Sequence, residues 1–290
     1  SAQQKLDIVK RQLPTLKLGE INAAFAKHFD NKAFAFSINM PEKTDIAIPS
    51  SDEVLAVAKS ALARTPAPLS ETDAPETLLA AAPKPGTLLD VQTDQDLQIT
   101  SAWLGNGVRV HHRHMDYKKD TVLISITLAG GQIEEKQDTL GLTEVAAGAL
   151  RQQPATSRLT STQMRDLMTG VNVGVSAGAG EDTMGFRVSG SPKDIEKGLE
   201  MVHALITDGV IEESFVKNWK QRMEQQRAML MRMPEFKAFE ALSESLFGGD
   251  PRHRPILAED RVKAITTADV QKWFDRLRTQ APIEVAVVGD

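Results

Sequence analysis

The chain has 290 residues, of which 41% are hydrophobic and 25% charged, an ordinary composition with room for one large domain or two smaller ones. Its net charge of −5 argues against a general nucleic-acid binder, because no basic excess is present to neutralise phosphates. The absence of cysteine excludes disulfides and thiolate metal sites, and no apolar run approaches the roughly 20 residues of a membrane span.

The first 64 residues predict helices and one strand. Apolar residues recur at helical spacing over 16–29, and a short polar turn follows at 30–32. The next apolar residues alternate with smaller or polar ones, which predicts a strand over 34–40. A further helix is expected over 51–64. The plan of this segment is therefore helix, turn, strand and helix.

Residues 65–87 are expected to connect this segment to the rest of the chain. They contain five prolines, which remove backbone donors and fix φ, so the stretch should be extended and belong to neither a helix nor a sheet. Three parts follow from this division: residues 1–64, a proline-rich linker over 65–87, and a larger domain over 88–290.

The end of the chain repeats the plan of its beginning. At a constant offset of 249 residues, with no gap, the strand over 34–38 aligns with 283–287, and three apolar helix positions also align: Leu16 with Ile265, Ile21 with Val270, and Phe25 with Phe274. Apolar positions in register across two element types indicate an internal repeat. We therefore expect the tail of one domain followed by nearly all of a second, related domain.

The region between the two repeats alternates strands with helices. The Asn106–Gly107 turn predicts a hairpin. Strands are expected over 108–114, 122–128, 171–175 and 184–188, and helices over 140–152, 161–169, from Ser191 onward, 215–230 and 235–247. Strands joined by hairpins and interleaved with helices indicate an α+β fold.

Several of these stretches together resemble the pitrilysin (M16) family of zinc metallopeptidases. They are the Leu104–Gly107 turn, a strand that ends in Gly130–Glu134, a helix that follows Gly141–Leu142, and the final strand IEVAVVGD. The resemblance implies a mixed, mostly antiparallel sheet with helices packed on one face. It also implies that residues 1–64 are the C-terminal remnant of a preceding domain of the same type.

The family's zinc-binding motif is missing from this chain. Catalytic members carry His-x-x-Glu-His on the helix after Gly-Leu, and those positions fall here on Glu144, Ala147 and Gly148. The third ligand of the family falls near Glu224. We therefore expect no catalytic, metal-binding or cofactor-binding residue in this segment, and zinc in an upstream unit of the full-length protein. We also expect the three helix positions to face an open cleft, where the missing ligands would be tolerated.

Other candidate residues are interpreted as structural. His112 and His114 share one strand face and His111 lies on the other, and a polar strand face is favoured over a metal site. His203 is expected to be half-buried in a helix, and Glu134–Glu135 to be a solvated pair whose carboxylates point apart. Two further sets are interpreted as strand glycines and as core or groove filler: Gly174, Gly178, Gly180 and Gly185, and Met223, Met229, Met231 and Met233.

Two functions remain open. In the first, the segment is the inactive half of a zinc-dependent endopeptidase, where it forms one wall of a chamber that holds a peptide or unfolded polypeptide next to the catalytic unit of the same protein. In the second, it is a non-enzymatic scaffold or assembly subunit. An upstream His-x-x-Glu-His would favour the first. A bacterial periplasmic or exported location fits the resemblance and the lack of cysteine.

Overall fold

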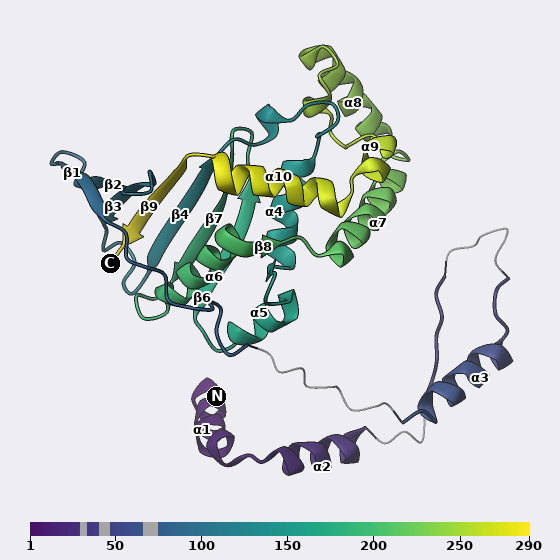
Figure 1. The fold of residues 1–290 in the computed structure, drawn as a ribbon. Coiled ribbons are helices and arrows are strands. Elements are labelled where there is room, and N and C mark those ends of the chain that lie inside the picture. Colours follow the sequence, from purple (N-terminus) through teal and green to yellow (C-terminus); the bar gives the residue numbers. More distant parts are fainter. Residues whose placement is uncertain (30–33, 41–46, 66–74) are drawn as a thin grey trace. The chain divides into compact units, whose positions relative to one another are not determined.

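The computed structural model describes residues 1–29, 34–40, 47–65 and 75–290. The chain divides into two compact units, Ser1–Glu71 and Thr72–Asp290, each of which is described by itself (Figure 1). The expected turn at 30–32 and part of the proline-rich stretch lie outside the described residues.

The first unit consists of short helices with exposed apolar side chains. Its helices are α1 (Ala2–Gln12), the 3₁₀ turn η1 (Leu13–Thr15), α2 (Leu18–His28) and α3 (Ser51–Leu62). The prediction of a strand over 34–40 is wrong, because these residues pair with no strand of the described chain. An extended segment becomes a strand only when a neighbouring edge bonds its backbone groups.

The second unit is built on a seven-stranded sheet. Its strand order is β1-β2-β3-β9-β4-β7-β6; β3 and β9 are parallel and every other neighbouring pair is antiparallel. Its strands are β1 (Leu88–Asp94), β2 (Ile99–Leu104), β3 (Arg109–His114), β4 (Val122–Ala129), β6 (Val173–Ala179), β7 (Thr183–Gly190) and β9 (Ile283–Gly289). Two short strands, β5 (Ala155–Thr156) and β8 (Gly209–Val210), pair separately.

Helices follow the strands and cover one face of the sheet. They are α4 (Leu142–Gln152), α5 (Ser161–Leu167), α6 (Ile195–Asp208), α7 (Glu213–Leu230), α8 (Pro234–Phe247), α9 (Glu259–Ala264) and α10 (Thr267–Gln280), with 3₁₀ turns η2 (Gln132–Glu134) and η3 (Pro251–His253). Of these, α4 and α6 pack on β6 and β7, and α10 packs on α4 and β4 (Figure 1). The mostly antiparallel α+β fold with helices on one face is confirmed.

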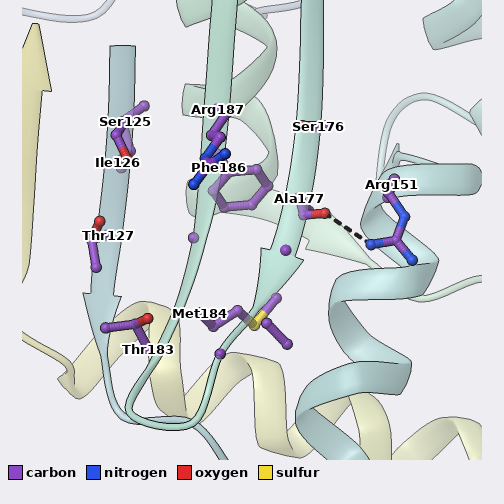
Figure 2. Close-up of a pocket in the computed structure, with 14 residues that line it drawn as sticks. Ser125, Ile126, Thr127, Arg151, Ser176, Ala177, Thr183, Met184, Phe186 and Arg187 are labelled. Carbon is purple, nitrogen blue, oxygen red and sulfur yellow. Dashed lines mark hydrogen bonds between the residues drawn. The ribbon is translucent and has the colours of Figure 1, made fainter.

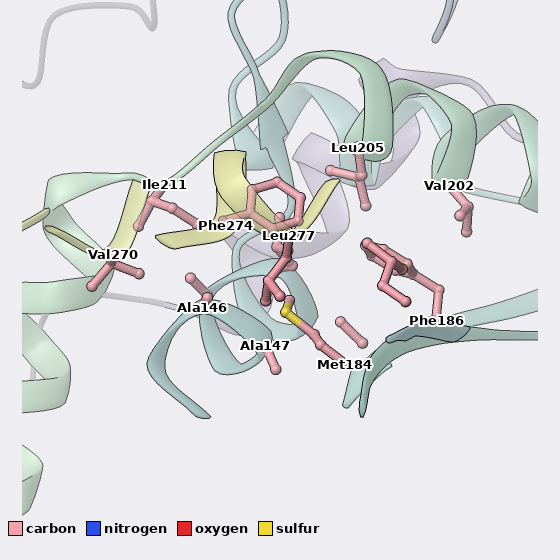
Figure 3. Close-up of a cluster of buried hydrophobic side chains, with 14 of the residues drawn as sticks. Ala146, Ala147, Met184, Phe186, Val202, Leu205, Ile211, Val270, Phe274 and Leu277 are labelled. Atoms are coloured by element: carbon pink, nitrogen blue, oxygen red, sulfur yellow. The ribbon is translucent and has the colours of Figure 1, made fainter. Parts of the chain in front are cut away.

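The alternation of side chains along β4 separates the two faces of the sheet. Ile124, Ile126 and Leu128 are buried toward the helices, whereas Leu123 on the other face is exposed. The buried side chains of the strands join Phe274 and Leu277 of α10 and Leu205 of α6 in one core (Figure 3). The face without helices, called the open face below, comprises the residues that alternate with the buried ones.

Some predicted boundaries shift for local reasons. The helix expected from Ser191 begins only at Ile195, because the Ser191 hydroxyl donates to the Asp194 carboxylate at 2.9 Å and holds the preceding residues in a turn. The sequence pattern did not predict β1 and β2, at one side of the sheet, as two separate strands. Their alternation is weak, since β1 is exposed along its whole length.

The described part of the proline-rich stretch packs on the second unit. Residues 75–87 form neither helix nor strand, yet Leu78 is only 2% exposed and belongs to the core. The guanidinium of Arg158 donates to the Thr77 carbonyl at 2.6 Å. This part of the stretch is therefore anchored to the second unit. Among the described residues, no helix is both long and apolar enough to cross a membrane.

Candidate functional site

The helix that aligns with the family's zinc helix is held firmly at its start. Gly141, which precedes α4, has a φ of 81°, a left-handed conformation that suits glycine. The buried carboxylate of Glu135 accepts hydrogen bonds from the backbone N–H groups of Gly141 (2.7 Å) and Thr143 (2.8 Å). A carboxylate at this end also interacts favourably with the helix dipole. Glu135 thus satisfies two amides that have no partner inside the helix.

The two expectations about Glu134 and Glu135 have different outcomes. The carboxylates do point apart, because Glu134 pairs with Arg276 at 2.7 Å while Glu135 caps α4. The expectation that both are solvated is wrong for Glu135, which is only 7% exposed. The helix start behind it supplies the amides that make its burial possible, and the sequence did not show that the loop folds back onto that end.

The expected cleft beside α4 is filled. Ala147 is 0% exposed, and a Cβ added to Gly148 would lie 3.1 Å from the ring of Phe215 on α7. Only Glu144 points outward, where it lies 3.8 Å from Arg151. The expectation that these positions face open space is therefore wrong for Ala147 and Gly148, which are buried, with the ring of Phe215 beside Gly148, and holds for Glu144.

These residues do not fit a zinc ion. Ala147 and Gly148 have no side-chain atom that could bind a metal, and both are packed against apolar neighbours. Glu224 is exposed on α7, nine residues beyond Phe215, which is about 13 Å along a helix. No chemical step through a metal can therefore be derived at this helix.

The histidines of β3 divide between the two faces of the sheet. On the open face, His111 Nδ1 lies 2.7 Å from Ser101 Oγ of β2, and His111 Nε2 lies 2.6 Å from a Glu284 carboxylate oxygen of β9. Ser101 therefore bonds one ring nitrogen, whereas Nε2 lies close to the Glu284 carboxylate without a hydrogen bond of suitable geometry. His112 and His114 are exposed on the opposite face. The structure thus links β2, β3 and β9 through one imidazole.

Two other structural expectations need correction. His203 is exposed on α6, because Val202 and Ala204 on either side of it take the buried positions. Met229 and Met233 are exposed as well, so they are not core filler. Met229 lies near the end of α7, far from the buried residues at its start, and Met233 caps the start of α8, so the hydrophobicity of the side chains did not reveal their exposure.

A hollow of about 410 Å³ lies at the β6 end of the open face (Figure 2). Its lining on that face comes from three adjacent strands: Ser125 and Thr127 of β4, Gly185 and Arg187 of β7, and Ser176 and Gly178 of β6. None of the three hydroxyl groups has a hydrogen-bond partner among the described residues. Hydroxyls can donate or accept, so the hollow suits a polar, extended ligand.

Two glycines of the sheet leave the hollow free of side chains at their positions. A Cβ at Gly185 would lie 2.3 Å from the Ile126 carbonyl oxygen, so the close approach of β7 to β4 requires glycine there. A Cβ at Gly178 would meet no atom within 4 Å. Gly178 therefore leaves space that a larger side chain would fill. The four glycines of this region do lie in or next to strands, as expected.

Arg151 closes the hollow at the edge of the sheet. It extends from α4, and its guanidinium donates to the Ala177 carbonyl of the edge strand β6 at 3.3 Å (Figure 2). Arg187 lies on β7, within the lining of the same hollow. The hollow is thus lined by two cations, hydroxyl groups and bare backbone, which is a lining for binding and contains no nucleophile–base pair.

Comparison with known proteins places the fold. No family model and no curated protein matches the sequence. Among solved structures, the periplasmic protease PqqL from Escherichia coli matches with a TM-score of 0.65 and 19% identity, over 83% of this chain and 26% of that one. The ferredoxin protease FusC, solved with Arabidopsis ferredoxin, has a TM-score of 0.65 and 17% identity over 100% of this chain and 32% of that one.

A third structure is an M16 peptidase inactive domain from Pseudomonas fluorescens. It matches with a TM-score of 0.55 and 16% identity, over 70% of this chain and 47% of that one. The fold is therefore that of pitrilysin-type (M16) peptidases, a fold that includes inactive domains. The chain spans only 26% and 32% of the length of the first two proteases.

Proposed function

We propose that this chain is the non-catalytic half of a pitrilysin-type zinc endopeptidase and that its second unit binds the polypeptide substrate on the open face of the sheet. The observation that carries the proposal is the contrast between two sites of the same domain. The helix that would hold zinc is packed shut by Phe215, whereas the opposite side of the sheet is bare and polar and contains a 410 Å³ hollow.

The open face suits an extended polypeptide. Its residues near the hollow are glycines and short hydroxyl side chains, so a main chain can approach the sheet closely. Unpaired hydroxyls can bond peptide carbonyls and amides without selecting a sequence. In this role the second unit is a wall of a peptide-binding chamber, and the catalytic unit of the same protein, which would hold zinc, is its partner.

We further propose that residues 1–64 are the end of a preceding domain of the same type. Helix α2 begins 249 residues before α10, the offset of the repeat. Phe25 is 62% exposed, whereas its counterpart Phe274 is 0% exposed in the core of the second unit. The apolar face of α2 thus matches a face that α10 buries against a sheet and α4, and an upstream domain would bury it in the same way.

Binding of an unstructured peptide to the 290-residue chain tests the function. Gly178→Val should weaken binding at least about fivefold, because its Cβ meets no atom within 4 Å and its side chain therefore occupies space in the hollow. Gly174→Val is the matched control: it changes the same strand and face, outside the hollow, with its Cβ at an ordinary 3.5 Å from Ser189 Oγ. Fluorescence anisotropy with a labelled peptide gives the affinities.

Absence of peptide binding by the parent chain would contradict the proposal. In that case a scaffold role, in which the fold serves only to hold other proteins together, becomes the better account. Equal loss of binding in the Gly178→Val and Gly174→Val chains would contradict the assignment of the hollow. The expected result is binding that the first substitution weakens and the second leaves unchanged.

A further inference from the structure

The open face carries positive charge on a chain whose net charge is −5. On strands β3, β9, β4, β7 and β6, the charged or titratable side chains of this face are Arg109, His111, Arg113, Arg187 and Glu284. Three guanidinium groups therefore face one carboxylate. Because the rest of the chain is acidic overall, this surface differs from what the composition predicts.

The single carboxylate on these five strands lies beside His111, and Asp94 of β1 is in register with Ile99 of β2 at the far edge of the sheet. Glu284 is the cross-strand neighbour of Arg109 but lies 2.6 Å from His111, and it forms no ion pair with any of the three arginines. No carboxylate among the described residues pairs with Arg109, Arg113 or Arg187, and the Nε of Arg113 is buried without a hydrogen-bond partner there. In this part of the chain, therefore, none of the three guanidinium groups is committed to a carboxylate; Arg109 and Arg187 are exposed, and Arg113 is half-buried.

The spacing of the arginines excludes a compact anion. Arg109 and Arg113 are four residues apart on β3, about 13 Å along a strand. Arg187 lies level with His111 across β9 and β4, three strand spacings or about 14 Å away. A single phosphate or carboxylate cannot span these distances, and each exceeds the screening length of about 8 Å at physiological salt. The ligand must carry several separated negative charges.

An aromatic side chain marks the other end of the same surface. Trp103 of β2 is exposed, and the Arg109 guanidinium lies over its ring, 5.7 Å from the ring centre. Five strand spacings, about 24 Å, separate β2 from β6 and its hollow. An extended peptide of about seven residues covers that distance.

Resting on the proposed function, we infer that the open face selects acidic polypeptide segments. A segment rich in Asp and Glu crosses the sheet from the hollow beside Arg187 to the Trp103–Arg109 pair. Its carboxylates meet the three arginines, and its backbone lies over the glycines and hydroxyl groups of the hollow. Each exposed ion pair contributes modestly, so the preference comes from several contacts along one ligand.

Three labelled peptides of about 12 residues test this inference on the 290-residue chain. They share one unstructured Gly/Ser framework with Glu, Gln or Lys at alternate positions, so that charges recur on one side of an extended chain. The Glu peptide is expected to bind about tenfold more tightly than the Gln peptide, and the Lys peptide more weakly than both. Raising the salt concentration should reduce the advantage of the Glu peptide.

Substitutions then assign the preference to the open face. Arg109→Gln, Arg113→Gln and Arg187→Gln should each weaken binding of the Glu peptide about two- to fivefold, and together they should abolish its advantage over the Gln peptide. Arg232→Gln is the matched control, since it removes the same charge from an exposed position outside the sheet. Circular dichroism of every variant confirms that the fold is retained.

The outcomes separate the inference from the proposed function. Equal affinities for the three peptides, or a preference for the Lys peptide, would overturn the selection of acidic segments and leave polypeptide binding intact. Binding of none of the peptides would overturn both. Tighter binding of a single-stranded oligothymidylate than of the Glu peptide would also overturn the inference, because the surface would then prefer a nucleic acid.

Discussion

Building the family's zinc motif into α4 should unfold the second unit rather than create a metal site. The perturbation combines Glu144→His, Ala147→Glu and Gly148→His. Ala147 is 0% exposed, and an unpaired carboxylate there costs several kcal/mol whether it ionises or binds a proton. A histidine at 148 must displace Phe215, since even its Cβ would lie 3.1 Å from that ring. Overpacking of this kind typically costs about 1–3 kcal/mol.

The summed loss in the free energy of unfolding is large compared with the stability of an ordinary domain. A loss of at least about 4 kcal/mol compares with the roughly 5–15 kcal/mol that separates folded from unfolded domains. Urea unfolding followed by tryptophan fluorescence measures the loss, because Trp273 is buried in α10 and its indole N–H donates to the Thr143 hydroxyl of α4 at 3.1 Å. Glu144→His alone is the control and should change stability by less than about 0.5 kcal/mol.

A second pair of variants isolates the role of Phe215. Phe215→Ala alone should cost about 3–5 kcal/mol, because it leaves a cavity in the core. In that background, Gly148→His should cost at least about 1 kcal/mol less than in the parent, since the ring no longer occupies the space. A triple variant within about 1 kcal/mol of the parent would refute the reasoning, and so would equal costs of Gly148→His in both backgrounds.

Two further predictions concern other parts of the second unit. Leu78→Ala should destabilise it by about 2–4 kcal/mol in urea unfolding, because this residue belongs to the core, whereas the exposed Leu97→Ala should change little; equal effects would contradict the packing of residues 75–87. Hydrogen bonds from Arg252 lower the pKa of Asp250 to about 2 from its ordinary value of 3.8, so the contribution of this pair is complete above pH 3.8 and is lost as the pH falls toward 2. Carboxyl NMR should show that midpoint in the parent and a higher one in Arg252→Ala, and an unchanged midpoint would contradict the pairing.

Regular periodicity made most of the fold of the second unit predictable. The alternation over 122–128 and the apolar stripe of α4 each have one dominant neighbour, so a local pattern is sufficient to identify them. The strands β1 and β2 were not predicted separately, because β1 is exposed along its length and contains a bulge, and both features weaken the alternation of apolar and polar residues. Residues 34–40 alternate well but form no strand, since pairing depends on a partner that a local pattern does not contain.

The candidate site was less predictable than the fold. The loss of the zinc ligands could be seen from Ala147 and Gly148, but the closure of their cleft depends on Phe215, 67 residues after Gly148. The hollow was missed because glycines and serines in strands give no distinctive motif. Alternation does place Arg109 and Arg113 on one face. Their proximity to Arg187 requires the strand order, in which β9 from the end of the chain lies between β3 and β4.

Photo-crosslinking of a bound peptide tests the central claim most directly. A Glu-rich peptide that carries a benzophenone group is bound to the 290-residue chain and irradiated, and the linked residues are identified by mass spectrometry. The account predicts crosslinks to the open face of β4, β6 and β7. Unlabelled Gln peptide should reduce these crosslinks only weakly, and the Gly178→Val substitution should also reduce them. Crosslinks confined to the exposed apolar residues Phe239, Leu242 and Leu246 of α8, with none on the sheet, would contradict it.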